Sequence, residues 1–314
     1  DDLGKISKNN TSLEMHIQEV INHPLVTVDK IKASGLKIVV DGVNSIGGIA
    51  IPALLKEFDL EVIELYCEPN GHFPHNPEPL KEHLGALSEK VIETSADLGI
   101  VVDPDVDRLA FMDENGEMFG EEYTLVACAD YVLSKKSGNT VSNMSSTRAL
   151  RDITEKHGGS YFSSAVGEVN VVTKMKEVDA VIGGEGNGGI IDPQLHYGRD
   201  SLIGTALFLS LLSGLKLSVS ELKKTYPEYF MSKGKIELEP SMEVDHLLNE
   251  IKKKYTDNKP NTIDGVKIDF ENSWVHIRKS NTEPIIRVYT EAPSQLDADD
   301  LMNRFKAELL AFGN

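Results

Sequence analysis

The chain has 314 residues, an apolar share of 40%, and 50 acidic against 32 basic side chains, which gives a formal net charge of −18 at pH 7. This length predicts two domains or three, and the negative charge argues against nucleic acid or an anionic membrane surface as a partner. The most apolar stretch, 201–215, is too short to span a bilayer. Two cysteines, Cys67 and Cys128, lack CxxC spacing, which indicates a reducing cytoplasm.

The first part of the chain alternates between strand and helix patterns. Strands are expected at 36–40, 61–67 and 98–102, and helices at 47–58 and around 80–95. Asn115-Gly116, between apolar alternations, signals a hairpin turn. This βαβ order predicts an α/β/α domain with a mostly parallel sheet over residues 1–119.

A second unit of the same kind is expected over 120–231. Its predicted helices lie at 121–136, 146–157, 168–177 and 201–215, and its strands at 140–144, 160–165 and 180–183. The pattern then changes. Residues 232–314 contain strands near 233, 263–270, 273–279 and 285–291, with helices at 242–255 and 295–312. Clustered strands flanked by helices predict a smaller α+β C-terminal domain.

Three aspartates follow the apolar run 98–102 at every second position: Asp103, Asp105 and Asp107, with Arg108 next. Such a cluster at the carboxyl end of a buried strand is typical of a site for a hard divalent cation that faces an anionic substrate. One alternative is a solvated acidic turn. Another is a phosphatase of the haloacid-dehalogenase type with Asp103 as nucleophile, although Asp107 stands where such enzymes usually carry Thr or Ser.

The glycine-rich segment 183–189 surrounds Glu185 and Asn187. Its glycines predict close approach of the backbone to a ligand, and a carboxylate beside an amide suits sugar hydroxyls. The alternative is a simple turn at the end of a strand.

Two further segments carry cations. The loop from Arg278 to Pro284, with Arg287 after it, predicts a cradle for a dianion, against the alternative of a solvated basic loop. Its other expected phosphate ligands are Ser280, Asn281 and Thr282. His196 and Arg199 precede the apolar helix and either face the same site or only cap that helix.

In this order the motifs resemble those of the α-D-phosphohexomutase family. Residues 103–108 (Asp-Pro-Asp-Val-Asp-Arg) look like its magnesium loop, 184–189 (Gly-Glu-Gly-Asn-Gly-Gly) like its sugar loop, and 278–287 like its phosphate loop. Residues 38–79 match its second domain. The resemblance covers essentially the whole chain and implies the second, third and fourth of the family's four domains.

The resemblance implies a mutase that interconverts hexose 6-phosphate and hexose 1-phosphate through a hexose 1,6-bisphosphate, with Mg²⁺ held by Asp103, Asp105 and Asp107 and with Arg108 acting on the phosphoryl group. The family's phosphoserine motif does not occur in these residues, so the first domain is expected as a missing partner. Val169 stands where many members carry Lys or Arg. The loops are similar to those of archaeal-type phosphoglucosamine mutases, with phosphoglucomutase/phosphomannomutase as the alternative. The rival hypotheses are the Asp103 phosphatase and a non-catalytic sugar-phosphate-binding protein.

Overall fold

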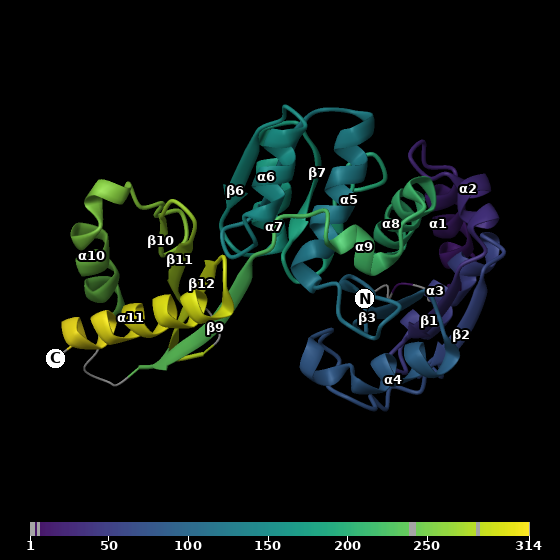
Figure 1. Cartoon of the computed structure of the whole chain (residues 1–314), viewed down its shortest axis with the longest axis horizontal. Helices are drawn as coiled ribbons and strands as arrows, with labels where there is room; N and C mark the ends of the chain where they lie inside the picture. The colour runs from purple at the N-terminus through teal and green to yellow at the C-terminus, as the bar shows by residue number, and fades with distance from the viewer. Residues whose placement is uncertain (1–3, 5–6, 239–242, 281–282, 314) are drawn as a thin grey trace.

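The computed structural model describes residue 4 and residues 7–238, 243–280 and 283–313. Figure 1 shows three bodies side by side, which follow one another along the chain from purple and blue through teal to yellow. Each body is built on a four-stranded sheet. Two sheets are mostly parallel and carry helices on both faces, and the third is antiparallel, which confirms the predicted fold class.

The first sheet has the strand order β2-β1-β3-β4. Its strands are β1 (Lys37–Asp41), β2 (Glu61–Leu65), β3 (Leu98–Val102) and β4 (Leu109–Met112), the last antiparallel to β3. Successive residues of β1 point to opposite faces. Ile38 and Val40 join the core under α3 (Gly47–Glu57), whereas Val39 packs with α4 (Gly85–Thr94), which follows the short helix η1 (Lys81–His83). Both faces of this sheet are therefore buried.

Two helices before β1 were not predicted: α1 (Ser12–Ile21) and α2 (Val28–Ser34). Ile17 and Val20 are the buried residues of α1. Both helices pack against α8 (Ser201–Leu215) of the second domain, and α1 also meets α3. The amino-terminal helices thus brace the junction between the first two domains.

The second sheet has the order β6-β5-β7-β8. Its strands are β5 (Asn139–Asn143), β6 (Tyr161–Ser164), β7 (Ala180–Glu185) and β8 (Gly189–Ile191). Its helices are α5 (Glu121–Lys135), α6 (Ala149–Lys156), α7 (Glu168–Glu177), α8 (Ser201–Leu215) and α9 (Val219–Lys223). α8 is buried along most of its length. None of the helices in the described part of the chain combines the length and apolarity that crossing a membrane requires.

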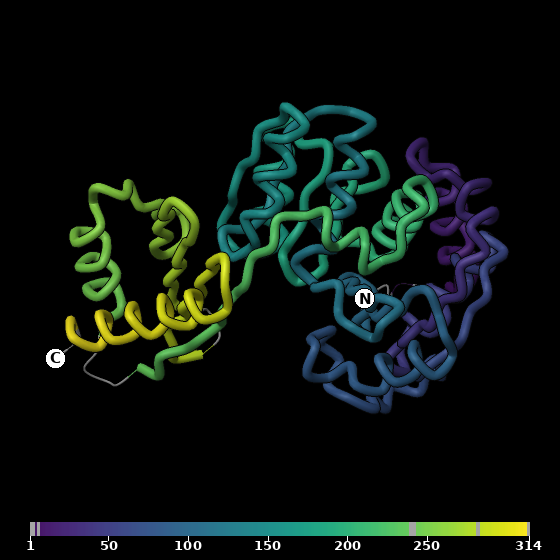
Figure 2. The backbone as a smooth tube through the Cα atoms, viewed as in Figure 1, coloured from purple at the N-terminus to yellow at the C-terminus, as the bar shows by residue number. Residues whose placement is uncertain are grey.

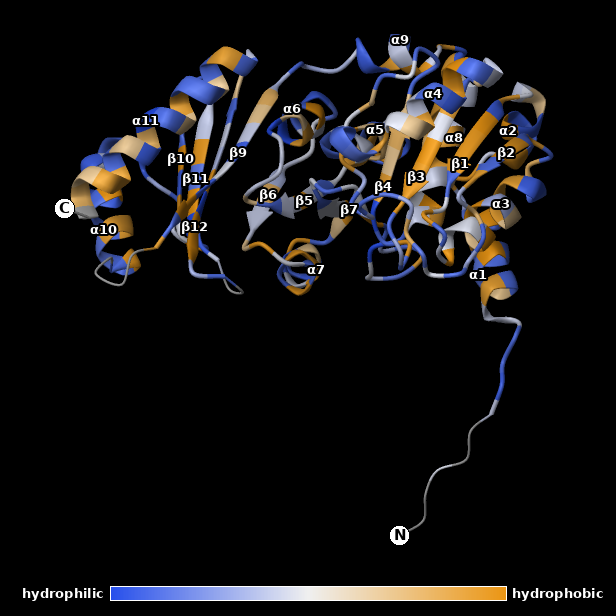
Figure 3. Ribbon diagram, turned by 90° about the horizontal axis from the view of Figure 1, so that it is seen from below, coloured by the Kyte–Doolittle hydropathy of each residue, from blue (hydrophilic) through white to orange (hydrophobic). Residues whose placement is uncertain are grey.

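The C-terminal sheet has the order β10-β11-β12-β9. Its strands are β9 (Phe230–Glu237), β10 (Val266–Asp269), β11 (Trp274–Lys279) and β12 (Ile285–Ala292). Its helices are α10 (Val244–Lys254), η2 (Thr256–Asn258) and α11 (Gln295–Gly313). The sheet shares one apolar cluster with α10 and α11. Figure 2 shows the chain entering this domain through β9, and Figure 3 shows the three sheets in a row.

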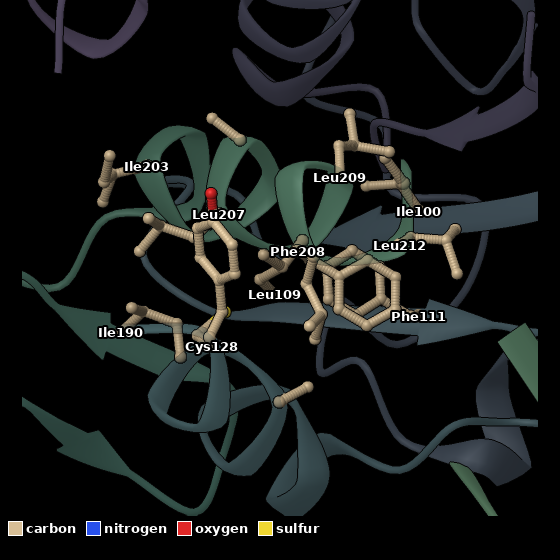
Figure 4. Close-up of a cluster of buried hydrophobic side chains, with 14 of the residues drawn as sticks. Ile100, Leu109, Phe111, Cys128, Ile190, Ile203, Leu207, Phe208, Leu209 and Leu212 are labelled. Carbon is tan, nitrogen blue, oxygen red and sulfur yellow. The ribbon is translucent and has the colours of Figure 1, made fainter. Parts of the chain in front are cut away.

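One apolar core runs through both of the first two domains. It joins Ile100 and Phe111 of the first sheet to Phe208 and Leu212 of α8 and to residues of α5. The rings of Phe111 and Phe208 are stacked with their centroids 3.8 Å apart (Figure 4). Because this core is continuous, the first two domains form a single packed unit.

The C-terminal domain meets that unit through polar groups. Ser145 Oγ lies 2.9 Å from His276 Nδ1, and the Lys267 ammonium donates to a main-chain carbonyl of the second domain at 2.8 Å. The Arg148 guanidinium donates to the carbonyls of residues 270–271 at 3.2 and 3.1 Å. The contact between the second and third bodies therefore rests on hydrogen bonds, in contrast to the apolar junction between the first two.

Candidate functional site

Residues 103–108, the segment predicted to bind a metal and called the metal loop below, begin where β3 ends and return the chain to β4. Asp103 is nearly buried, and its Oδ1 accepts the N–H groups of Asp107 and Arg108, each at 3.0 Å. Val106 adopts a left-handed conformation with φ of 62°, which a β-branched residue rarely takes. Asp105 is exposed at the loop tip. The loop therefore folds around the Asp103 carboxylate.

The carboxylate oxygens of Asp103, Asp105 and Asp107 lie within 4.8 Å of one another. Burial raises the pKa of Asp107 to about 6, the neighbouring aspartates add to the rise, and Arg199 opposes it. Burial also raises the pKa of Asp103, against the lowering effect of its N–H partners. Asp107 Oδ1 is buried and has no hydrogen-bond partner among the described residues. An all-oxygen, electron-rich cluster with an unused buried oxygen fits a divalent cation.

Arg199 connects the metal loop to the second domain. Its guanidinium contacts Asp107 through Nη2, lies 3.0 Å from Glu185 Oε2 through Nη1, and lies 3.5 Å from Glu168 through Nε. Its main-chain N–H also donates to Glu168 Oε1 at 3.1 Å. The side chain is 15% exposed, so these charges interact with little screening by water. This arrangement is consistent with the prediction that Arg199 lies at the same site as the aspartates.

The glycine-rich segment is a hairpin rather than a single loop. β7 continues to Glu185, and β8 begins at Gly189, antiparallel to it. A Cβ at Gly186 would lie 1.9 Å from Glu122 Oε2, and one at Gly188 would lie 2.2 Å from the Leu109 carbonyl. A glycine is therefore needed at position 188 by a main-chain contact within the protein, whereas at position 186 the neighbour is the end of the Glu122 side chain. Close approach of this segment to a ligand stays a prediction.

Glu185 is 5% exposed and has protein partners on both oxygens. Asn143 Nδ2 and the Gly167 N–H donate to Oε1 at 2.9 and 3.2 Å, and Arg199 occupies Oε2. Asn187 is half-buried at the hairpin tip. Val169, which the resemblance singled out, is 78% exposed. Its neighbour Glu168 was not predicted as a site residue, because its contact with Arg199 is not marked by any local sequence motif.

The basic loop lies between β11 and β12. Arg278 and Arg287 are directly opposite each other in the strand register, and Arg287 is in turn opposite Lys235 on β9. Cross-strand partners share one face of a sheet, so three cations form a row there. Ser280 is buried. The predicted ligands Asn281 and Thr282 lie outside the described residues.

Arg108 and His196 take different positions. Arg108 Nη1 lies 3.2 Å from Glu78 Oε1, and its Nε lies 3.5 Å from Asp103 Oδ2, so Arg108 borders the metal loop. His196 turns instead toward Asp200 and His16. Within the described parts of the chain, Arg278, Arg287 and Lys235 form no hydrogen bond or ion pair with the metal loop or with Glu185.

A pocket of about 980 Å³ opens at the amino-terminal end of α5. It is separate from the three predicted loops. Glu122, Tyr123, Tyr229 and Lys233 are among the residues that line it. None of the site residues predicted from the sequence contributes to its lining.

Three family models match consecutive parts of the chain. The model described as phosphoglucomutase/phosphomannomutase, alpha/beta/alpha domain II, matches residues 14–116, the corresponding domain III model matches 120–229, and the model of the C-terminal domain matches 235–308. The matches follow the three sheets in order and together cover nearly the whole chain.

One sequence relative and two solved structures agree with these family matches. The chain is 34% identical over 310 residues to a probable phosphoglucosamine mutase from Methanopyrus kandleri, covering 97% of this chain and 67% of that protein. A crystal structure of a phosphoglucomutase/phosphomannomutase family protein from Burkholderia thailandensis superposes with a TM-score of 0.79 at 26% identity, covering 91% and 63%. An N-acetylphosphoglucosamine mutase from Aspergillus fumigatus, in complex with GlcNAc-6P and magnesium, shares the fold (TM-score 0.62, 16% identity, 95% and 68%). The chain thus spans about two thirds of the length of these proteins.

Proposed function

Because the chain belongs to the phosphoglucomutase/phosphomannomutase family, we propose that it forms the substrate-binding part of a phosphohexomutase, which interconverts hexose 6-phosphate and hexose 1-phosphate through a bisphosphate. The observation that carries this proposal is the Arg199 bridge. It brings a three-aspartate loop of one domain against a buried glutamate of the next, so that groups suited to a metal and to a sugar meet.

Asp103, Asp105 and Asp107 would hold the metal, and Mg²⁺ suits their oxygen donors. When bound, such an ion neutralises charge on a phosphoryl group in transfer. Arg108, fixed between Asp103 and Glu78, would donate to the oxygens of that group. The pair Arg278 and Arg287, with Ser280, Asn281 and Thr282, would hold the phosphate that stays on the sugar.

Glucosamine phosphate is the proposed substrate. The ammonium group of an amino sugar would compete with the Arg199 guanidinium for the buried Glu185 carboxylate, whereas a neutral hydroxyl would compete less well. Asn187, at the hairpin tip, would bind a hydroxyl. A glucose or mannose phosphate is the alternative, in line with the broader family name. The free thiols Cys67 and Cys128 are consistent with action in a reducing cytoplasm.

A phosphoserine would supply and recover the phosphoryl group. The matched family models number their domains from II to the C-terminal one, so we place this serine on a further domain outside these 314 residues. Phosphoryl transfer depends chiefly on positioning and charge stabilisation, which the three loops described above would provide.

The first test is calorimetric titration of the chain with glucosamine 1,6-bisphosphate and Mg²⁺, beside the glucose and mannose bisphosphates. Binding that requires Arg278 and Arg287, and Mg²⁺ binding that is lost in Asp105→Asn, are the expected results. Release of inorganic phosphate from simple esters, abolished by Asp103→Asn, would favour the phosphatase instead. Supplying a phosphoserine domain from a relative separates the other rival, because a binding protein would still not isomerise the sugar.

A further inference from the structure

A second cluster of metal-ligating side chains lies outside the three loops. It joins His16 of α1, His196 of the segment 192–200, and Asp200, which caps the amino terminus of α8. The Nε2 atoms of His16 and His196 lie 2.7 and 2.9 Å from the same oxygen, Asp200 Oδ2. All three ligand atoms lie within 4.8 Å of one another.

The two oxygens of Asp200 have different roles. Oδ1 accepts the main-chain N–H groups of Leu202 and Ile203, at 2.7 and 3.3 Å, which fixes the carboxylate as the cap of α8. Oδ2 is left to face the two imidazoles. Asp200 is 5% exposed, whereas the side chains of His16 and His196 are 33% and 44% exposed. The cluster therefore has a rigid, buried acid at its base and two imidazoles that reach solvent.

We propose that His16, His196 and Asp200 form a binding site for a single divalent transition-metal ion of the Zn²⁺ class, separate from the magnesium loop. Two imidazoles and one carboxylate are the donor set that zinc takes in three-ligand protein sites, where a water completes the tetrahedron. Imidazole is a poor ligand for Mg²⁺, while an all-carboxylate loop suits it. The two clusters would thus select different metals by their donor atoms.

The geometry requires only a small adjustment. Tetrahedral ligand atoms about 2.0–2.1 Å from zinc lie roughly 3.3 Å apart. The two Nε2–Oδ2 distances of 2.7 and 2.9 Å would each widen by about half an ångström, which rotations of the exposed imidazoles provide. The amino terminus of α8 disfavours a cation, but the same helix end stabilises the Asp200 charge that attracts one.

Because of the position of the cluster, an ion bound there would connect two segments of the chain. Asp200 directly follows Arg199, whose guanidinium joins Asp107 to Glu185. At the other end of the same segment, Asp192 lies 3.5 Å from the buried His23, just beyond α1. A bound ion would cross-link α1 to the segment that carries Arg199, and so hold that arginine in place from outside the substrate site.

The test is a competition titration of Zn²⁺ against a chromophoric chelator, with purification tags removed. The background is Asp103→Asn/Asp105→Asn, which disables the magnesium loop. We expect one zinc per chain in this background, and a loss of affinity of more than about 100-fold on adding His16→Gln or His196→Gln, beyond the cost of a merely supporting contact. His246→Gln, an exposed histidine on α10, is the matched control and should bind as the background does.

X-ray absorption of the zinc-loaded chain with intact loops keeps the test independent of variant folding. Two imidazole ligands per zinc would support the site, and none would overturn it. Absence of stoichiometric zinc in the double-aspartate background, or undiminished binding in both histidine variants, would also overturn it. None of these outcomes bears on sugar-phosphate binding, so the zinc site and the proposed function fail separately.

Discussion

Arg278 and Arg287 stand directly opposite each other on β11 and β12, and Lys235 continues the row on β9. Like charges at directly opposed positions destabilise a sheet unless an opposite charge lies between them. Glu283 contacts Arg287 at 2.7 Å and Glu237 contacts Lys235 at 2.8 Å, and both glutamates are exposed. An anion that displaces the exposed carboxylates of Glu237 and Glu283 would therefore be stabilised by the three cations of this row.

Replacing Arg287 by Gln should weaken binding of a sugar phosphate by about 10- to 100-fold, since a charge-assisted hydrogen bond contributes roughly 1.5–3 kcal/mol. The same change should leave the free energy of unfolding equal or slightly higher, because it removes a repulsive neighbour. Calorimetry with glucosamine 6-phosphate measures the first effect and urea unfolding the second. Lys252→Gln, an exposed residue of α10, is the charge-matched control. Equal affinity in the two variants would exclude this row as the phosphate site.

Replacing Arg199 by Gln should have opposite effects on stability and on metal binding. Glu185 would be left buried without its cationic partner, so the free energy of unfolding should fall by about 3 kcal/mol. The metal loop would lose a neighbouring positive charge, so Mg²⁺ should bind several-fold more tightly and recover part of the lost stability. Urea unfolding with and without Mg²⁺ measures both.

Arg151→Gln is the control for the Arg199 variant. Arg151 lies on α6, is about one third exposed and pairs with its neighbour Asp152. Its loss should change stability by less than about 1 kcal/mol and leave Mg²⁺ affinity as it was. An Arg199 variant that behaved like this control would show that the bridge to Asp107 and Glu185 carries little energy.

The His276 contact predicts acid sensitivity. Burial lowers the pKa of His276 to about 4, and the imidazole is held between Ser145 Oγ and the Asp264 carbonyl at 2.9 and 2.7 Å. Between pH 6.5 and about 4, His276 binds a proton in the unfolded chain but not in the folded chain. The contribution of His276 to the free energy of unfolding is therefore complete above about pH 6.5, and about 3 kcal/mol of it is lost as the pH falls toward 4.

Unfolding by urea at a series of pH values between 4 and 7 checks this, with His276→Gln beside the parent protein. The glutamine has the same donor and acceptor but no titration, so its pH dependence over this range should be shallower. The exposed His246→Gln should follow the parent curve. Parallel curves for the parent and His276→Gln would rule out His276 as the titrating group.

Glu122 predicts the opposite trend, a loss of stability as the pH rises from about 4.5 to about 8. Its carboxyl lies beneath Gly186, and burial raises its pKa to about 8, although Lys233 lowers it in part. Between its ordinary pKa of 4.5 and about 8 the folded state binds a proton that the unfolded state has released. The contribution of Glu122 therefore falls as the pH rises through this window. Glu122→Gln should gain a few kcal/mol over the parent at pH 9 and much less at pH 5; an equal difference at both values would contradict the assignment.

Much of the fold could be predicted from residue patterns because the central strands are buried on both faces. β3 is apolar throughout and β1 is apolar at its centre, between Lys37 and Asp41, and the helix 201–215 was placed with its observed bounds. α1 was not predicted although its apolar residues do face the core: Ile17 and Val20 are buried, and Leu13 and Ile21 pack against the same core. β8 was missed because Gly189 has little intrinsic strand preference and is held there by pairing with Glu185.

The sequence predicted the residues of the candidate site but not the contacts between segments that are distant in sequence. Asp103, Asp105 and Asp107 are close in sequence, so their convergence was evident. The Arg199 bridge to Asp107 spans 92 positions, and no local pattern specifies it. Lys235 entered the cationic row only through the register of β9 against β12. Contacts of this kind depend on tertiary packing, which a single sequence does not display.

The difference between the two domain junctions predicts which of them would part more easily. Parting the first two domains would expose the stacked rings of Phe111 and Phe208 to water, at a high free-energy cost. The C-terminal domain has its own closed core, and water can replace the hydrogen bonds of Ser145 and Arg148 at little net cost. We therefore expect the molecule to open at the contact with the C-terminal domain, with β9 as the hinge, which would move the predicted phosphate ligands Arg278 and Arg287 relative to residues 103–108.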